Sequence, residues 1–376
     1  MNPFVVYPSL LLAVIWIAYP LAIRLIGAWR RRDEALPLHT PTTSVSLIVA
    51  SADDAQSIRE RVADLLATSY PADLIEVVVA VDVLHGQAAI DALSDLDPRV
   101  RVVQGDAPGG KATTLNAAVR AASHELLVFA DTAQRFDRNA ISALVGAMND
   151  PRLGAVSGML DLPGSDGSLN LAERYWRYER WLRFWEARVH STVGVTGAIY
   201  AMRRILWTPL PPGLILDDVY LPLRLILEGW RIGFTDRAIA YDTRRFKPEQ
   251  EFRRKVRTLT GNIQVCAWLP DVLHPFRNPV WLQFLCHKLL RRLTPYLAAF
   301  VVLGLVVMVV GVATSSPLAL LVAMVVIIGF LAACLHARVR RVVRTQIAWG
   351  VALQGSVVLA AVNGMRGKWD VWSRSA

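Results

Sequence analysis

Residues 74–82 read LIEVVVAVD, a run rich in β-branched side chains that ends on a carboxylate. Similar short runs occur at residues 45–50 (VSLIVA), 100–103 (VRVV) and 125–131 (ELLVFAD). Strands that are apolar on both faces belong to parallel sheets that are covered by helices on both sides. We therefore predict an α/β domain with a mostly parallel sheet over residues 40–277.

Helical stretches separate these strands, at residues 57–68, 111–122 and 139–148. In open α/β sheets, ligands bind in the crevice at the carboxyl ends of the strands. Asp82 and Asp131 each close a strand, so both are predicted to point into one crevice.

An uncharged segment precedes the domain. Residues 4–23 are long enough to cross about 30 Å of hydrocarbon as a helix. A secretory signal peptide is the rival interpretation, but a basic segment before the apolar run and a small-residue cleavage site are both missing. Arginines follow at residues 24 and 30–32, so the positive-inside rule places the N-terminus outside and the domain in the cytosol. We predict a transmembrane helix over residues 1–30.

The last third of the chain is apolar again. Long apolar runs occupy residues 297–312 and 318–335, and a weaker run occupies residues 347–362. We predict transmembrane helices within residues 295–365 and a short tail at residues 366–376.

A different pattern lies just before these runs. Residues 280–293 (VWLQFLCHKLLRRL) place apolar side chains at helical spacing beside a histidine and three basic residues. This pattern is typical of a helix in the membrane interface, which we predict over residues 278–294. An ordinary amphipathic packing helix is the alternative. A second basic patch, ARVRRVVR at residues 337–344, is predicted on the cytosolic side.

The composition limits the partners. Apolar residues make up 54% of the chain, charged residues only 19%, and the net charge is +10. A basic protein can bind nucleic acid, an anionic membrane or a phosphorylated substrate. Because the arginine clusters lie beside apolar runs, we expect contact with membrane lipids and no nucleic-acid partner. The cysteines at 266, 286 and 334 form no CxxC pair, which favours a reducing compartment.

A glycine-rich segment follows the third strand. GDAPGGKATTLN (residues 105–116) nearly matches the phosphate-binding pattern GxxxxGK[ST], but Ala112 stands where a hydroxyl should bind Mg²⁺. A P-loop ATPase is therefore a rival hypothesis, and a glycine turn that enters a helix is the simpler one. Under either functional interpretation, Lys111 near a helix N-terminus is placed to attract phosphate.

Acidic residues supply further candidates. Asp131 at a strand end can hold Mg²⁺ or Mn²⁺, or it can cap the next helix. The adjacent Asp217 and Asp218 precede an amphipathic helix, where one can act as a cap or as a general base. The basic cluster EFRRKVRTLTGN (residues 251–262) can contact lipid headgroups or bind pyrophosphate.

Taken in order, these segments resemble the processive-type family-two inverting glycosyltransferases. That group includes cellulose, hyaluronan and poly-N-acetylglucosamine synthases and the ceramide glucosyltransferases. The similarity runs over residues 45–292, with apolar segments flanking it in the expected places. The resemblance implies a GT-A-type nucleotide-sugar-binding domain flanked by transmembrane helices, held at the cytosolic face of the inner membrane.

The resemblance also implies a donor site. SLIVASADD matches an acidic loop that touches the nucleotide, with Asp53 and Asp54 in place of the usual Asn-Glu. Asp82 corresponds to the aspartate that reads the base, and GGKATTLN to the segment that places a lysine near the donor phosphates. The implied nucleotide- and donor-binding residues are Asp53, Asp54, Asp82, Lys111, Asp131 and Arg257.

FADTAQRF occupies the place of the metal-binding DxD motif. Asp131 matches its first aspartate, and Ala133 stands at the second. The resemblance therefore implies that Mg²⁺ or Mn²⁺ is held by Asp131, the diphosphate and water, or with the help of another group.

The acceptor side is implied in the same way. VTGAIYAMRR resembles the segment beneath the donor sugar, and LDDVYLPLRL resembles the Thr-Glu-Asp motif, with Asp218 as the base. RKVRT occupies the place of the Gln-x-x-Arg-Trp motif, of which only Arg257 matches. Aromatic contacts from YWRYERWLRFW are a further candidate, with core packing as the alternative. The implied acceptor-side residues are Gly197, Ala198, Asp217, Trp176 and Glu179.

We therefore predict a membrane glycosyltransferase that uses a nucleotide-sugar donor, with a UDP-sugar as the expected donor. It would transfer the sugar with inversion to a glycan or lipid acceptor, in polysaccharide or glycolipid synthesis. Two alternatives stay open: a P-loop ATPase, and a non-catalytic membrane partner with a degenerate transferase domain.

Overall fold

The computed structural model describes residues 2–30, 43–161, 171–242, 244, 248–318, 320–322, 324, 325, 328, 329 and 355–369. The predicted basic patch at residues 337–344 lies outside them. Most of the predicted apolar run at residues 318–335 and most of the tail at residues 366–376 also lie outside them.

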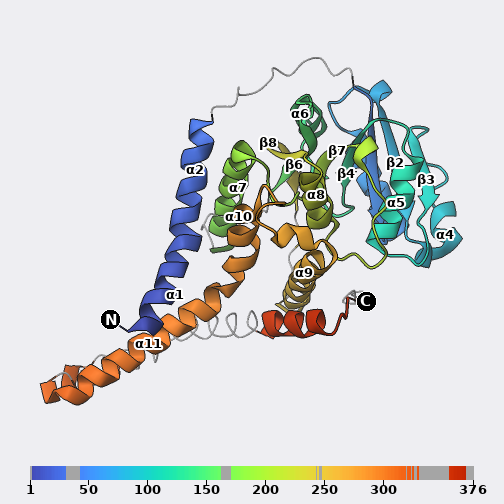
Figure 1. Ribbon diagram of the computed structural model, residues 1–376. Helices are drawn as coiled ribbons and strands as arrows, with labels where there is room; N and C mark the ends of the chain where they lie inside the picture. The colour runs from blue at the N-terminus through green and yellow to red at the C-terminus, as the bar shows by residue number, and fades with distance from the viewer. Residues whose placement is uncertain are drawn as a thin grey trace.

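The described residues form an eight-stranded sheet in the order β3-β2-β1-β4-β7-β6-β8-β5 (Figure 1). Its first half is parallel and consists of β1 (Val45–Ser51), β2 (Ile75–Val81), β3 (Val100–Gln104) and β4 (Leu126–Ala130). These are the four apolar runs of the sequence. The predicted α/β domain with a mostly parallel sheet is confirmed.

The second half of the sheet is mixed. β7 (Ile199–Arg203) runs antiparallel between β4 and β6 (Leu153–Asp161). β8 (Arg231–Tyr241) pairs parallel with β6, and the short β5 (Arg135–Phe136) pairs antiparallel with β8. Because β7 is reversed, its start lies beside the carboxyl end of β4. The segment before β7 therefore borders the edge at which ligands bind in parallel sheets.

Helices cover both faces of the sheet. On one face, α3 (Ala55–Leu66) and α6 (Ala140–Ala147) bury apolar side chains against β1, β2 and β4. On the other face, α5 (Lys111–Ala121) and α8 (Asp217–Leu227) share a core with the opposite side of the same strands. The shorter elements are α4 (Gly86–Asp91) and the 3₁₀ turns Ala72–Leu74, Val83–His85, Arg204–Leu206 and Pro270–Leu273.

Two helices of the described residues are long and apolar enough to cross a membrane. The first, Pro3–Trp29, combines α1 (Pro3–Ala13), a π-helical turn (Val14–Ala18) and α2 (Tyr19–Trp29). The second, Trp281–Gly311, lies within a continuous helical stretch of α10 (Trp281–Gln283), a π turn (Phe284–Leu289), a 3₁₀ turn (Leu290–Leu293) and α11 (Thr294–Ser315). Figure 1 shows α1 crossing α11, and the two helices are in contact.

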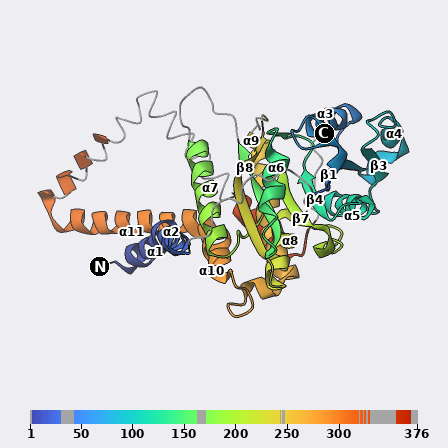
Figure 2. The same ribbon diagram turned by 90° about the horizontal axis from the view of Figure 1, so that it is seen from above.

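The helix α7 (Leu171–Val189) joins these apolar helices to the sheet. It lies along α2 on one side, and the start of the second apolar helix packs against it (Figures 1 and 2). The predicted interfacial segment at residues 278–294 therefore turns polar side chains toward α7. Its position in a membrane interface stays a prediction, as do the boundaries given above for the membrane segments.

The helix α9 (Pro248–Trp268) reaches the helix formed by residues Gly355–Met365 near the C-terminus (Figure 1). A short apolar helix, Gly355–Met365, packs on it, because a Cβ at Gly364 would lie 2.6 Å from Ile263 Cγ2. This helix belongs to the weaker apolar run at residues 347–362, and it is too short to count as a span by itself.

Candidate active site

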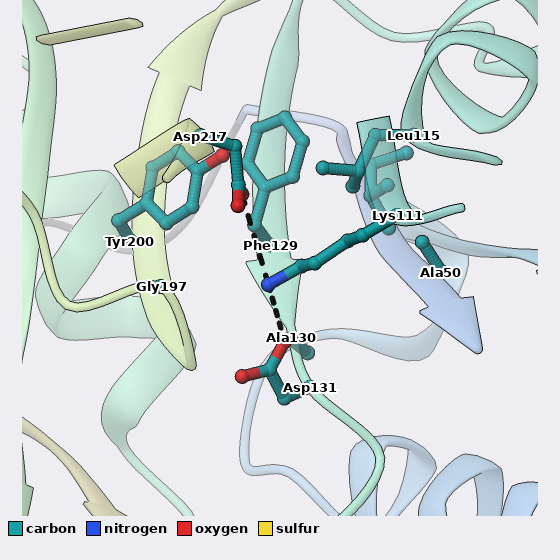
Figure 3. A pocket seen from close by; sticks show the side chains of 10 residues that line it. Ala50, Lys111, Leu115, Phe129, Ala130, Asp131, Gly197, Tyr200 and Asp217 are labelled. Carbon is teal, nitrogen blue, oxygen red and sulfur yellow. Dashed lines mark hydrogen bonds and ion pairs between the residues drawn. The ribbon is translucent and has the colours of Figure 1, made fainter. Parts of the chain in front are cut away.

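Three elements bring charged side chains to the end of β4 (Figure 3). Asp131 follows β4, Lys111 begins α5 and Asp217 begins α8. The Lys111 ammonium donates a hydrogen bond to Asp131 Oδ1 at 3.0 Å and lies 3.7 Å from Asp217 Oδ2. All three side chains line one pocket together with Gly197 and Tyr200. The structure thus brings Asp217 beside two residues that lie more than 80 positions before it in the chain.

The ammonium of Lys111 stays charged in this pocket. Burial by itself lowers the pKa of Lys111, but the carboxylates of Asp131, Asp217 and Asp218 outweigh it and raise the pKa above its ordinary value. A permanent positive charge among several carboxylates suits a site that receives a diphosphate.

Asp82 organises the loop that carries Lys111. One of its carboxylate oxygens accepts a hydrogen bond from Leu84 N at 2.9 Å, and the other accepts one from Gly110 N at 2.8 Å. Gly109 has a φ of +94°, and a Cβ there would lie 2.9 Å from Asp82 Oδ1. The chain therefore needs glycine where this loop passes over the carboxylate. The predicted contact of Asp82 with a nucleotide base stays a prediction.

Asp218 lies beside the segment that precedes β7. Its backbone oxygen accepts a hydrogen bond from Val195 N at 2.8 Å. A Cβ added to Gly197 would lie 3.3 Å from Asp218 Cβ and 3.5 Å from Asp218 Oδ2. The glycine leaves space directly in front of the carboxylate, and the neighbouring Ala198 is buried.

The environment of Asp218 favours a proton acceptor near neutral pH. Burial and the neighbouring Asp217 raise the pKa of Asp218 to about 6, against the opposing charges of Lys111, Lys288 and Arg183. Among the described residues, the buried Oδ1 atom of Asp218 has no hydrogen-bond partner. A general base works best when its pKa lies near the operating pH.

Arg257 reaches the same acidic group from α9. Burial lowers the pKa of its guanidinium, and Asp218, Asp217 and Asp131 act in the opposite direction. The predicted donor-site arginine therefore lies within electrostatic reach of all three carboxylates.

The acidic loop after β1 divides into two roles. Asp54 caps α3, because it accepts hydrogen bonds from Ser57 N at 2.8 Å and from Ser57 Oγ at 3.0 Å, and these bonds lower its pKa. Asp53 is exposed at the same edge of the sheet and accepts a hydrogen bond from Ser51 Oγ at 3.2 Å. Nucleotide contact by either residue stays a prediction.

Glu179 of α7 is committed to other protein groups. Its carboxylate contacts His287 at 2.8 Å, Arg291 at 3.0 Å and Arg183 at 3.2 Å. Burial raises its pKa, but these partners hold it well below its ordinary value. Trp176, also on α7, has its ring centroid 6.4 Å from that of Tyr175. Acceptor contact by Glu179 or Trp176 stays a prediction.

Two features of the site were not predicted from the sequence. Tyr200 stacks on Phe129, with centroids 4.3 Å apart, and Trp207 stacks on Phe129 from 5.5 Å. Arg244 is held by Asp242 through bonds of 2.8 and 2.9 Å, and its charge acts on Asp131 and Asp53. The short run after β8 that holds Arg244 carries no motif that would have singled it out.

The donor set around Asp131 fits a metal ion that is shared with a substrate. One oxygen of Asp131 bonds Lys111, and the side chain is 37% exposed, which leaves the second oxygen accessible. Within the described part of the chain, no cluster of three His, Cys, Asp or Glu residues provides a protein-only site. Mg²⁺ is often bound by one or two carboxylates together with substrate phosphates.

Known proteins share this architecture. Residues 41–261 match the family described as Glycosyltransferase like family 2, so the chain belongs to this family. The domain has an α/β GT-A fold, and the family that it matches is one of glycosyltransferases. An N-acetylglucosaminyltransferase of Azorhizobium caulinodans is 26% identical over 227 residues. That match covers 55% of this chain and 56% of the relative, so the chain spans about half the length of that relative.

A solved structure resembles the whole chain. The mannosyltransferase PcManGT from Pyrobaculum calidifontis, determined in complex with GDP-Man and Mn²⁺, has a TM-score of 0.68 and 20% identity. The match covers 96% of this chain and 98% of that one. At this identity the likeness shows a common fold.

Proposed function

We propose that this glycosyltransferase moves a sugar, with inversion, from a nucleotide-sugar donor to a hydroxyl acceptor at the cytosolic face of the inner membrane. One observation carries the proposal: Lys111, Asp131 and Asp217 line a single pocket at the end of β4, and the charge of the adjacent Asp218 acts on Lys111. The pocket pairs a fixed cation for a leaving diphosphate with a carboxylate suited to take a proton.

Asp218 serves as the general base. It takes the proton of the acceptor hydroxyl, and the oxygen attacks the anomeric carbon from the face opposite the nucleotide. A new bond joins oxygen to carbon while the bond from carbon to the diphosphate breaks. An α-linked donor therefore gives a β-linked product. The space in front of Gly197 accommodates the reacting groups beside the carboxylate.

Lys111 and Arg257 stabilise the departing diphosphate. The first is held between Asp131 and Asp217, and the second approaches from α9. Fixed positive groups aimed at developing negative charge need no reorganisation during the reaction. Asp131 and the diphosphate oxygens would hold Mg²⁺ or Mn²⁺, which neutralises charge on the leaving group.

The donor and acceptor classes follow from the surroundings. The relative's name indicates N-acetylglucosamine transfer, and the structure of PcManGT is a complex with a GDP-sugar, so both UDP- and GDP-sugars are candidates, with a UDP-sugar favoured. The two apolar helices beside α7 favour a lipid or glycan acceptor delivered at the membrane. Polysaccharide and glycolipid synthesis are the roles that this arrangement supports.

A nucleotide-release assay tests the proposal. The full-length protein in lipid nanodiscs is incubated with UDP- and GDP-sugars, UDP-N-acetylglucosamine and GDP-mannose included, in the presence of a membrane lipid extract. We expect one donor to release its nucleoside diphosphate only when the extract is present, and labelled sugar to enter the extract with inverted configuration. ATP serves as the control nucleotide and should not be hydrolysed.

Two outcomes would contradict the proposal. Absence of nucleotide release with every donor would favour a non-catalytic membrane partner. Retention of configuration at the anomeric carbon would remove Asp218 from the role of base, because a single displacement inverts.

A further inference from the structure

A second group of basic side chains lies where the second apolar helix meets α7. Lys288 and Arg292 are four positions apart on the stretch that leads into α11, and both are partly buried. Figures 1 and 2 show this stretch, from α10 into α11, beside α7 and close to the first apolar helix.

The two nearby glutamates form contacts with other side chains of the protein. Glu179 binds His287, Arg183 and Arg291. Glu186 accepts a hydrogen bond from the Tyr19 hydroxyl and lies 2.8 Å from the other ring nitrogen of His287. Both carboxylates are buried, and the contacts of Glu186 all use Oε1, while its Oε2 has no hydrogen-bond partner among the described residues.

Lys288 and Arg292 are left out of the network. Among the described residues, neither side chain forms a hydrogen bond or an ion pair. The cluster contains four cations, Arg183, Lys288, Arg291 and Arg292, against the carboxylates Glu179 and Glu186. Asp218 is a third carboxylate whose charge acts on Lys288. Partly buried cations that outnumber the nearby carboxylates and make no direct contact with them are costly next to apolar helices, so this excess favours binding of an anion.

The excess charge borders the acceptor side of the pocket. The charges of Lys288 and Arg183 both act on Asp218. Arg183 Nη1 donates a hydrogen bond to Thr196 Oγ1 at 3.1 Å, and Thr196 directly precedes Gly197. Lys111, by contrast, reaches the carboxylates from α5, on the other side of the sheet's centre (Figure 1). Lys111 and Lys288 thus both act on Asp218, but they come from different elements of the fold.

We propose that Lys288 and Arg292 bind the phosphate or diphosphate of an anionic lipid, and that this lipid is the acceptor. Its tail would lie along the exposed apolar side chains of α11, and its hydroxyl would face Asp218. The headgroup phosphate stays intact, because the new bond forms at the hydroxyl oxygen and Asp218 receives its proton. This inference rests on the proposed function and specifies its acceptor.

Binding of farnesyl diphosphate tests the site without any donor. The full-length protein in dodecyl maltoside is titrated calorimetrically with farnesyl diphosphate and with farnesol. Two charge-assisted contacts should make the diphosphate bind at least about 30-fold more tightly than the alcohol. The double variant Lys288→Gln, Arg292→Gln should weaken diphosphate binding about 100-fold and leave farnesol binding as it is.

Two further variants control for misfolding and for general charge loss. The charge-preserving pair Lys288→Arg, Arg292→Lys should bind farnesyl diphosphate within about fivefold of the wild type. Arg277→Gln removes an exposed arginine that is paired with Asp271 at 2.7 Å, and it should not change the affinity.

Other results would overturn the inference. Equal affinity for diphosphate and alcohol, or no loss in the Gln variants, would show that these cations bind no phosphate. Inorganic pyrophosphate binding as tightly as the lipid probe would point to a soluble ligand. Dimyristoyl phosphatidylglycerol binding as tightly would point to general lipid contact. Because titration needs no turnover, failure here leaves the proposed transferase function standing, and a missing transferase activity leaves the titration interpretable.

Discussion

Replacing Asp218 by Asn should abolish transfer and at the same time stabilise the fold. Loss of a general base lowers the rate by roughly 10²–10⁴-fold. The pKa of Asp218 is raised from 3.8 to about 6, which corresponds to about 3 kcal/mol of destabilisation at neutral pH. Because the side chain is only partly buried, we expect about 1–3 kcal/mol, or about 3–9 °C in melting temperature.

The stability gained by Asp218→Asn should depend on pH. An acid whose folded pKa exceeds its unfolded pKa destabilises the fold above the folded value, and the effect disappears as the pH falls toward 3.8. About half of the gain from Asp218→Asn should therefore remain at pH 5 compared with pH 7.5.

Thermal unfolding, followed by tryptophan fluorescence in detergent at one scan rate, measures the gain. Asp236→Asn is the matched control, because Asp236 is exposed on β8. It should change neither turnover nor melting temperature. If Asp218→Asn melted at or below the wild-type temperature at pH 7.5, the buried-carboxylate argument would be refuted. Retained turnover in that variant would remove Asp218 from catalysis.

Four further predictions concern the same pocket. Lys111→Met should lower kcat/KM for the donor by at least about 100-fold, because Asp131 and the diphosphate lose their shared cation; steady-state kinetics over a donor series would show it. In wild-type enzyme, kcat/KM should rise with pH and level off above about pH 6, as Asp218 becomes deprotonated, and a profile that is flat from pH 5 to 7 would argue against it. Gly197→Ala should reduce kcat about 10-fold or more with little loss of stability, because the new Cβ would enter the space 3.5 Å from Asp218 Oδ2. Gly146→Ala is the control and should leave kcat unchanged, because a Cβ at Gly146 meets nothing within 4 Å. Chelation with EDTA should lower turnover and added Mn²⁺ should restore it, and Asp131→Asn should weaken Mn²⁺ binding in the presence of nucleoside diphosphate, as read by electron paramagnetic resonance.

The parallel half of the sheet was predictable because its strands are locally distinct. Each of β1, β2 and β4 is a continuous apolar run, and burial on both faces demands such a run. The mixed half was not predicted. β7 lies inside the segment VTGAIYAMRR, which was interpreted as an acceptor-side motif and not as a strand. β8 mixes exposed and buried residues over 11 positions. Pairing between β6 and β8 joins residues about 80 positions apart, and no local pattern reports such a contact.

The site was predictable for residues that lie directly at the end of a strand or the start of a helix, because the fold then determines where their side chains lie. Lys111 and Asp217 begin helices and Asp131 follows a strand, so their convergence follows from the topology of the sheet. The roles of Asp82 and Asp54 were harder to foresee, because each depends on backbone N–H groups that the fold presents to the carboxylate. A sequence shows which residue carries a carboxylate, but not which donors surround it.

The contact between the first helix and α7 limits how the protein can be truncated. Tyr19 and Ile23 pack with Leu182 and Cys286, and the Tyr19 hydroxyl donates to the buried Glu186. Deleting the first helix to obtain a water-soluble fragment would uncover this apolar surface and take a donor from an enclosed carboxylate. Such a fragment should aggregate or unfold, because the N-terminal helix, besides being a candidate membrane span, is part of the packing around α7.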